Sequence, residues 1–403
     1  MTQLIDALAR RQTAICLMLM VLLLFLRRPD AFLQPQFWAE DGTIFFRQQY
    51  LLGWQAIIQP YAGYLHLAPR LAAWLAAGVA GPELAPFLYN AFALGLTLFV
   101  GYSVFNERLV LPLKFALALS IVLVPHRAGE VFMTITNIQW ILALYLITVF
   151  CRTEVWVNKK LGCKFRISEA IAVSLCGLTG PFGVMLTAII LFRVAATGRW
   201  VRRDLFLVLL ATTLIQLVFM MQRSAAESAD AFGLRQLMII IGRRLFAGVF
   251  IPRGGDLVPP EILCVCVFVL LCFLLYAGRR YSLFTFLTLG LSVAVVAATL
   301  NKFGWDLNQL YSFSGGPRYF FIPTVAYAWV LLVSINHLQR IGKVLVGCLL
   351  TAMLATSALN GFRAAPLLDL HWYRYASLIG RQNVKIPINP IGWEIDLIAR
   401  HSH

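Results

Sequence analysis

The stretch that decides the fold is "QTAICLMLMVLLLFL", residues 12–26, which is followed directly by "RRPD". It contains no charged residue, and its length approaches that of a helix crossing about 30 Å of hydrocarbon. Arginines stand where a signal peptide would carry the small residues of a cleavage site. We therefore expect an uncleaved first membrane span.

Apolar runs of this kind recur along the whole chain, which has 403 residues, 60% of them hydrophobic and 13% charged. Because lipid offers no hydrogen-bond partners to a backbone, such spans are helices. We predict an all-α polytopic membrane protein with about 11 transmembrane helices. The predicted spans are 12–26, 84–104, 111–125, 136–151, 169–179, 181–192, 204–221, 261–277, 281–299, 320–336 and 344–358.

The charge distribution predicts the orientation of these spans. The chain carries a net charge of +16, and the loops on one side of the predicted spans hold half of the lysines and arginines but under a third of the acids. Positive loops stay in the cytoplasm. The basic charge thus indicates topology, and we expect membrane lipids, and no nucleic acid, around the chain.

With this orientation the N-terminus is cytoplasmic and the C-terminus extracytoplasmic. We predict one transmembrane domain over 1–358, which includes a long first external loop over 27–83, and a short extracytoplasmic tail over 359–403. The first external loop is rich in aromatic residues, and apolar residues gather on one side of 43–52, which favours juxtamembrane helices on the bilayer surface.

Two short predicted spans meet at "LTGPFG", residues 178–183. Gly180 and Pro181 would end one helix and start another. Broken helices at membrane depth occur where they line a cavity or are covered by protein. An ordinary tight hairpin between two buried helices explains the same pattern, and the sequence leaves both interpretations open.

The first external loop contains an acidic pair within "QPQFWAEDGTIFFRQQY", residues 34–50. Glu40 and Asp41 repel each other and lose solvation near a bilayer, which raises at least one pKa and makes a candidate general base. A simpler interpretation is that Asp41 caps a helix starting at Thr43. Capping leaves Glu40 unexplained.

Further along the same loop, "PYAGYLHLAPRLAAWL", residues 60–75, gathers hydroxyl, imidazole and guanidinium groups. Tyr61, Tyr64, His66 and Arg70 could together bind a phosphate or a sugar. Tyrosines also form ordinary interfacial belts. A cation in an apolar helix is costly without a partner, so Arg70 is the stronger indication of a ligand.

The second external loop leads into a span through "PHRAGEVFMTITNIQW", residues 125–140. Glu130 is its only acid and follows His126 closely. A lone loop glutamate is usually solvated, and hydroxyls entering a span often bond to their own helix. The amides of Asn137 and Gln139 are rarer there and suit a polyhydroxylated ligand.

A late external loop ends in "SGGPRYFFIP", residues 314–323, just before a predicted span. Two glycines allow a close approach of a ligand to the backbone. Arg318, next to Tyr319, could hold a lipid-linked phosphate through paired charge-assisted hydrogen bonds. The alternative is that Arg318 extends toward lipid headgroups.

Three of these features occur in the order typical of one family: the acidic pair in the first external loop, the aromatic segment 61–74 before the second span, and Glu130 in the second external loop. The chain resembles the GT-C superfamily of polyprenyl-phosphate-sugar-dependent membrane glycosyltransferases, particularly bacterial members of surface-polysaccharide and O-antigen modification loci. It differs from the aminoarabinose and protein-mannosyl transferases in having "APR" at 68–70 instead of Lys-Pro-Pro, and in lacking their large C-terminal domain.

The resemblance implies a GT-C-like fold in the bacterial cytoplasmic (inner) membrane and an inverting transfer of a sugar from undecaprenyl phosphate to a glycan or lipid-linked acceptor at the outer face. It assigns Asp41 as general base, Glu40 as its partner or alternate, and Glu130 as a second acid. Arg70 and Arg318 would neutralise the departing lipid phosphate. No cofactor is required, and no metal-ligand cluster is apparent, although a divalent ion at Asp41 and Glu130 is an alternative.

Two other classes compete with this interpretation. A transporter or flippase of a lipid-linked sugar could line its path with the same acids and arginines, but the chain shows no internal repeat of the kind many transporters have. An envelope acyltransferase would favour an intramembrane His–Asp pair, and a phosphoethanolamine transferase a large soluble metal-bearing domain. Neither feature is evident in the sequence.

Overall fold

The computed structural model describes residues 2–126, 129–153, 163–222, 233–252 and 258–399. Within these residues the chain is mostly helical, with one two-stranded sheet near its C-terminal end. The predicted helical class is therefore confirmed, and the small sheet was not predicted from the sequence.

The elements follow one another as a series of long helices interrupted by short helical turns. In chain order they are α1 (Thr2–Arg27), α2 (Asp30–Leu33), η1 (Asp41–Phe46), α3 (Arg47–Leu52), η2 (Gly53–Ile58), α4 (Leu67–Val79), η3 (Pro82–Leu84), α5 (Ala85–Val104), α6 (Lys114–Leu123), α7 (Ile138–Phe150), α8 (Cys163–Gly177), α9 (Phe182–Thr197), α10 (Arg203–Met221), α11 (Leu234–Gly242), η4 (Arg243–Ala247), α12 (Gly248–Phe250), α13 (Pro260–Ala277), η5 (Gly278–Tyr281), α14 (Ser282–Lys302), η6 (Leu307–Leu310), η7 (Pro317–Phe320), α15 (Phe321–Ser334), η8 (Ile335–His337), α16 (Arg340–Leu359), α17 (Trp372–Ala376), β1 (Val384–Ile388) and β2 (Trp393–Leu397).

Among the described residues, 6 helical stretches are long and apolar enough to cross a membrane, and the longest of them, Pro260–Lys302, contains two predicted spans, α13 and α14. Each of the predicted spans coincides with a helix. Four of those helices, α6 to α9, are shorter than a full crossing requires. The number of spans and the GT-C-like arrangement thus stay predictions.

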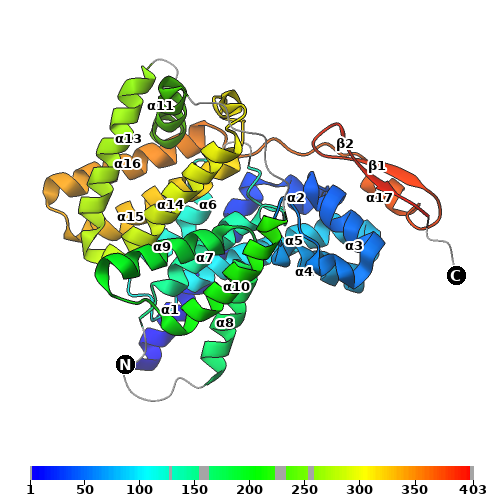
Figure 1. Cartoon of the computed structure of the whole chain (residues 1–403), viewed down its shortest axis with the longest axis horizontal. Coiled ribbons are helices and arrows are strands. Elements are labelled where there is room, and N and C mark those ends of the chain that lie inside the picture. The colour runs from blue at the N-terminus through cyan, green and yellow to red at the C-terminus, as the bar shows by residue number, and fades with distance from the viewer. Residues whose placement is uncertain (1, 127–128, 154–162, 223–232, 253–257, 400–403) are drawn as a thin grey trace.

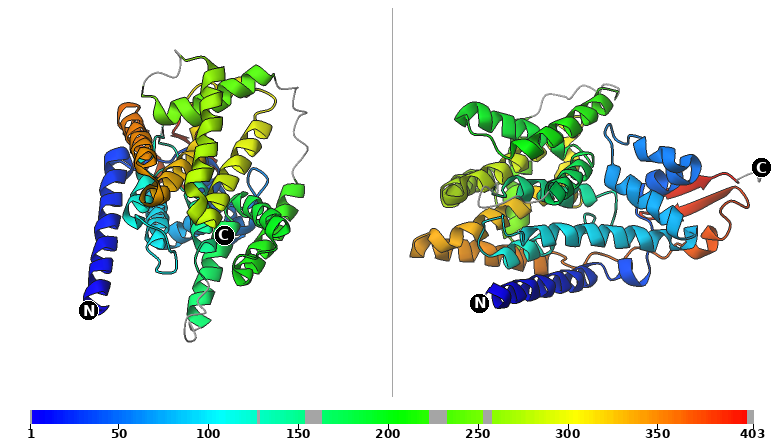
Figure 2. Two further views of the ribbon diagram at one scale, coloured as in Figure 1. Left: turned by 90° about the vertical axis from the view of Figure 1, so that its left-hand side faces the viewer. Right: turned by 90° about the horizontal axis from the view of Figure 1, so that it is seen from below.

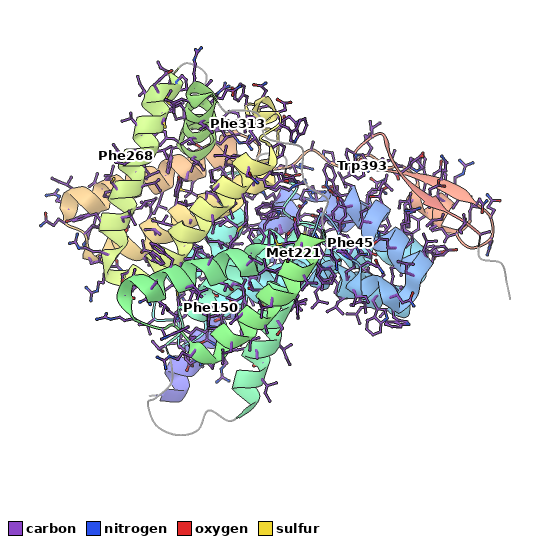
Figure 3. The ribbon with its side chains drawn as sticks, viewed as in Figure 1. Phe45, Phe150, Met221, Phe268, Phe313 and Trp393 are labelled. Carbon is purple, nitrogen blue, oxygen red and sulfur yellow. The ribbon has the colours of Figure 1, made fainter. Side chains whose placement is uncertain are left out.

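The helices form a large body and a smaller lobe (Figure 1). At the centre of the large body lie α7, in which every residue is buried, and α15, in which nearly every residue is. Both are apolar on all sides, as a helix enclosed by other helices must be. Phe150 lies in this body (Figure 3). The side chain of Trp329 donates a hydrogen bond to the Leu117 carbonyl at 3.0 Å, which joins α15 to α6.

The smaller lobe combines the predicted first external loop, 27–83, with the C-terminal tail, and these two segments lie side by side in both Figure 1 and Figure 2. The strands β1 and β2 pair antiparallel, with Ile386 opposite Ile395. Alternate residues of β1 face inward, as expected for a sheet with one covered face. They pack against Phe37, Phe45 and Trp372 in a separate hydrophobic core.

Candidate functional site

The acidic pair lies at the start of the π-helix η1, which begins at Asp41 and not at Thr43. Glu40 is the residue preceding the helix, and its side chain makes no capping hydrogen bond. The interpretation of Asp41 as a helix cap is therefore wrong, because its carboxylate is turned toward Thr136 at the start of α7. Single π-helical turns occur frequently at functional sites.

The C-terminal hairpin holds this turn in place. The Ala39 amide donates to the Asn389 carbonyl, and Ala39 itself has a φ of 36°, a strained value for a residue with a side chain. A Cβ at Gly42 would lie 2.7 Å from Ile395 Cδ1 and 2.8 Å from Ile388 Cδ1. Only glycine allows the hairpin to pack this closely against η1.

The Asp41 carboxylate is buried with a neutral partner. Its Oδ1 accepts a hydrogen bond from the Thr136 amide at 2.8 Å and a second one from the Thr136 hydroxyl. Asp41 is 2% exposed, and no ion pair to it is present in the described part of the chain. Burial raises the pKa of Asp41 to about 7, the charge of Glu40 adds to this rise, and the hydrogen bonds from Thr136 oppose it.

The side chain of Glu40 points toward the stretch 60–75 of the same loop. Its Oε1 accepts a hydrogen bond from the Tyr61 hydroxyl at 3.3 Å, and burial raises the pKa of that phenol. Tyr61 belongs to a tight turn in which the amides and carbonyls of Tyr61 and Tyr64 bond reciprocally, at 3.0 and 3.2 Å. Ala62, inside this turn, has a φ of 54° and is another strained position.

Glu130 pairs with Arg318, which is distant by 188 residues in sequence. The Arg318 amide donates to Oε1 at 3.0 Å, and its Nη1 donates to Oε2 at 3.3 Å. The carbonyl of Glu130 accepts hydrogen bonds from Asn137 Nδ2 at 2.8 Å and from the Thr134 hydroxyl at 3.0 Å. Glu130 is thus neither isolated nor fully solvated, and Asn137 is occupied in shaping its loop.

Segments from three predicted external loops meet at Arg318. The negative charges of Glu130 and of Glu40 both act on its guanidinium, which also lies 5.4 Å from the centre of the Tyr319 ring. Lys302, at the end of α14, donates a hydrogen bond to the Tyr319 hydroxyl. The structure therefore gathers carboxylates, a phenol and two cations from the predicted first, second and late external loops.

A second group lies behind the Phe45 ring. Its members are Arg70, whose guanidinium is 4.9 Å from the ring centre, and His66, whose ring is 5.7 Å away. The side-chain nitrogens of both residues are buried and have no hydrogen-bond partner among the described residues. Burial and the charge of Arg70 lower the pKa of His66 to about 3, so its imidazole is neutral. Tyr89, from α5, lies within electrostatic reach of both Asp41 and Arg70.

The predicted helix break at 178–183 is a tight turn between α8 and α9, and residues 65–67 of the predicted first external loop cover it. His66 and Thr179 form an isolated β-bridge. The Leu67 amide donates to the Leu178 carbonyl at 3.0 Å. Both interpretations of this motif thus hold in part: the turn is a hairpin, and protein covers it.

Gln216, which was not predicted as a site residue, links the first loop to the turn between α8 and α9. Its side chain accepts from the Leu65 amide at 2.8 Å and donates to the Leu65 and Gly180 carbonyls at 3.0 and 3.2 Å. The sequence feature that could have identified Gln216 is that it is the only side-chain amide in the apolar run 204–221. Gln139 approaches the same turn, because a Cβ at Gly180 would lie 2.2 Å from its Oε1.

His126 lies apart from the Glu130 carboxylate. Its ring packs edge-on against Phe132 and Phe321, its carbonyl accepts from Arg27 at 2.9 Å, and burial lowers its pKa. It lines a small hollow together with Arg244. Arg244 donates to carbonyls of the loop before η7, close to Phe313, which Figure 3 labels.

Across the residues that the structure describes, no three histidine, cysteine, aspartate or glutamate side chains gather as a metal site would require. Comparisons of the chain with protein-family models, with curated proteins and with solved structures find no match. The arrangement of the site itself is therefore the basis for any functional proposal.

Proposed function

We propose that the protein is an inverting membrane glycosyltransferase, which moves a sugar from a polyprenyl-phosphate donor to a glycan or lipid-linked acceptor at the outer face of the cytoplasmic membrane. The observation that carries the proposal is Asp41, a buried carboxylate whose pKa of about 7 suits a general base at neutral pH. The order of the acidic and aromatic motifs, which resembles the GT-C superfamily, gives the reaction class.

In this reaction Asp41 accepts the proton of an acceptor hydroxyl while the hydroxyl oxygen attacks the anomeric carbon. The bond from that carbon to the phosphate oxygen breaks, and polyprenyl phosphate leaves with the electron pair. Both hydrogen bonds from Thr136 reach Oδ1 of Asp41, so Oδ2 is the oxygen assigned to the acceptor proton. Since Asp41 is 2% exposed, its neighbours must move before an acceptor reaches it.

The leaving phosphate gains negative charge, and the proposal places it near Arg318 and Lys302. Arg318 has a side-chain exposure of 25%, whereas Arg70 is 1% exposed behind Phe45. Arg318 is therefore the better placed of the two predicted phosphate partners. Fixed cations at a developing charge supply the electrostatic part of catalysis.

The test is transfer of a radiolabelled hexose from undecaprenyl phosphate in membranes that contain the wild type, Asp41→Asn or Glu40→Gln. We expect Asp41→Asn to lower the rate by about 100-fold or more at unchanged protein level, as loss of a general base does. Glu394→Gln, an exposed acid of β2, serves as the control. If Asp41→Asn transferred sugar at the wild-type rate, the base assignment would be wrong.

Mass spectrometry of surface glycans with and without the gene identifies the sugar and its acceptor. A transporter or flippase would move the labelled lipid across the membrane without consuming it. Movement without consumption would contradict the transferase proposal in favour of that alternative.

A further inference from the structure

A hollow at the far end of α9 has no part in the site described above. The start of α9 lies next to Gly180, whereas its last turn carries Arg193 and Thr197. These residues, with Ala196, Arg199, Ser282 and Phe286, line a hollow of about 480 Å³ that opens to the exterior between α9 and α14. The charge distribution of the loops predicts that this end faces the cytoplasm.

The turn that follows α9 is held in one conformation by its own polar groups. Arg193 Nη1 donates to the Arg199 carbonyl at 2.7 Å, and the Thr197 hydroxyl donates to the Arg193 carbonyl at 2.8 Å. Gly198 has a φ of 67° and ends the helix with a hydrogen bond from its amide to the Val194 carbonyl at 2.7 Å. The side chain of Arg193 and the backbone of Arg199 are therefore held beside the hollow before any ligand arrives.

Among the described residues, no acidic side chain neutralises the positive charge of the hollow. Its lining includes no acid, and no ion pair involves Arg193 or Arg199 within the described ranges. The nearby acids are occupied elsewhere, since Glu169 and Asp204 both bind Arg202. Guanidinium groups bind phosphate oxygens through charge-assisted hydrogen bonds, and hydroxyl groups can add further donors.

An apolar surface formed by Leu191, Phe192 and Phe286 borders the charged part of the hollow. The rings of Phe192 and Phe286 are stacked, 6.4 Å apart and 8° from parallel. Phe192 is 67% exposed and Leu191 is 45% exposed on the outside of α9. A ligand that combines a phosphate with an acyl chain meets both halves of this surface, whereas a free phosphate ion meets only one.

From this combination we propose that the hollow between α9 and α14 binds the phosphate headgroup of an anionic membrane lipid. Arg193 and Arg199 hold the phosphate, the Ser282 hydroxyl adds a further donor, and the lipid chain lies along Phe192. The site is separate from Asp41, so this proposal does not depend on the proposed transferase activity.

The experiment uses the purified full chain in detergent. Binding of phosphatidylglycerol is followed by native mass spectrometry and by the rise in unfolding temperature, with diacylglycerol and inorganic phosphate as separate arms. We expect phosphatidylglycerol to bind the wild type at least fivefold more tightly than Arg193→Gln/Arg199→Gln, and diacylglycerol to show no such difference. Arg340→Gln/Lys343→Gln, at the start of α16, removes equal charge on the same predicted side and should bind like the wild type.

Arg199→Gln alone keeps the internal bonds of the turn, because its side chain makes none of them, and should weaken binding at least twofold. Equal phosphatidylglycerol affinity in the wild type and in both arginine variants would overturn the proposal. Equal stabilisation by inorganic phosphate and by phosphatidylglycerol at the same concentration would also overturn it, because the hollow would then be a site for free phosphate.

Discussion

A buried carboxylate from another element lies near each end of α7, and the two carboxylates have opposite kinds of partner: neutral groups at one end and cations at the other. In front of the helix, Asp41 accepts two hydrogen bonds from Thr136. Beyond its end, Glu169 is surrounded by three arginines, with Arg152 at 2.7 Å and Arg202 at 2.8 Å. The third, Arg108, bonds the same carboxylate oxygen as Arg152.

The difference separates a structural carboxylate from a reactive one. Full positive charges keep Glu169 ionised and join the ends of α5, α7, α8 and α10. Asp41 is hydrogen-bonded by the turn that leads into α7, and no cation pairs with it among the described residues. A carboxylate that is buried without a cation holds its proton near neutral pH, where it can exchange that proton with a substrate.

The largest effect is expected from Glu169→Gln. The change leaves Arg108 and Arg152 without their anion and leaves Arg202 with Asp204 alone. The side chains of Arg152 and Arg202 are 5% and 3% exposed. Stability should fall by about 3–5 kcal/mol, measured by chemical unfolding in detergent. The control is Glu394→Gln, which breaks an exposed pair with Lys385 and should change stability little. If Glu169→Gln lowered stability no more than Glu394→Gln does, the claim that Glu169 is a structural carboxylate would be wrong.

A smaller loss is expected from Gly42→Ala, which tests whether the C-terminal hairpin positions Asp41. The new methyl group meets the ends of Ile388 and Ile395, and overpacking of this kind costs about 1–3 kcal/mol. Ile395→Val removes one of the two contacting methyl groups. The double variant Gly42→Ala/Ile395→Val should recover part of the stability and of the transfer rate that Gly42→Ala alone loses. Recovery of neither would show that the hairpin does not support the acidic turn.

The smallest effect is expected from Thr136→Val. This change removes the hydrogen bond that the Thr136 hydroxyl donates to Asp41 and keeps the one that the Thr136 backbone amide donates. Because the hydrogen bond from the hydroxyl lowers the pKa of Asp41, its loss should raise the pKa further, by about one unit or less. The acidic limb of the pH–rate profile should move to higher pH. Thr134→Val, whose hydroxyl bonds the Glu130 carbonyl instead, is the matched control and should leave the limb in place.

Local sequence features predicted much of this structure. The uncharged run 12–26 and its counterparts predicted the helices, Gly180 and Pro181 predicted the break between α8 and α9, and the contrast of Glu40 and Asp41 with their apolar surroundings drew attention to the acidic turn. Each of these signals lies within a few residues of the feature that it predicts.

Contacts between distant segments could not be predicted in this way. Thr136 and Asp41 are separated by 95 residues, and Gln216 and Leu65 by 151. The arginines around Glu169 come from three different loops. The helix-cap interpretation of Asp41 failed for the same reason, because a single sequence does not state which distant donor competes with the local one.

The most direct test of the central claim compares the stability of the wild type and Asp41→Asn from pH 4 to pH 8.5. The folded protein holds the Asp41 proton up to a pKa of about 7, against 3.8 for an ordinary aspartate, so the folded state binds more protons between these values. Ionisation of Asp41 should therefore lower wild-type stability as the pH rises through that range.

We predict that Asp41→Asn is more stable than the wild type by about 1–3 kcal/mol above pH 7, and that the difference disappears toward pH 4. A difference that does not change with pH, or a wild type that is the more stable protein above pH 7, would contradict the account of Asp41 as a buried carboxylate without a cation.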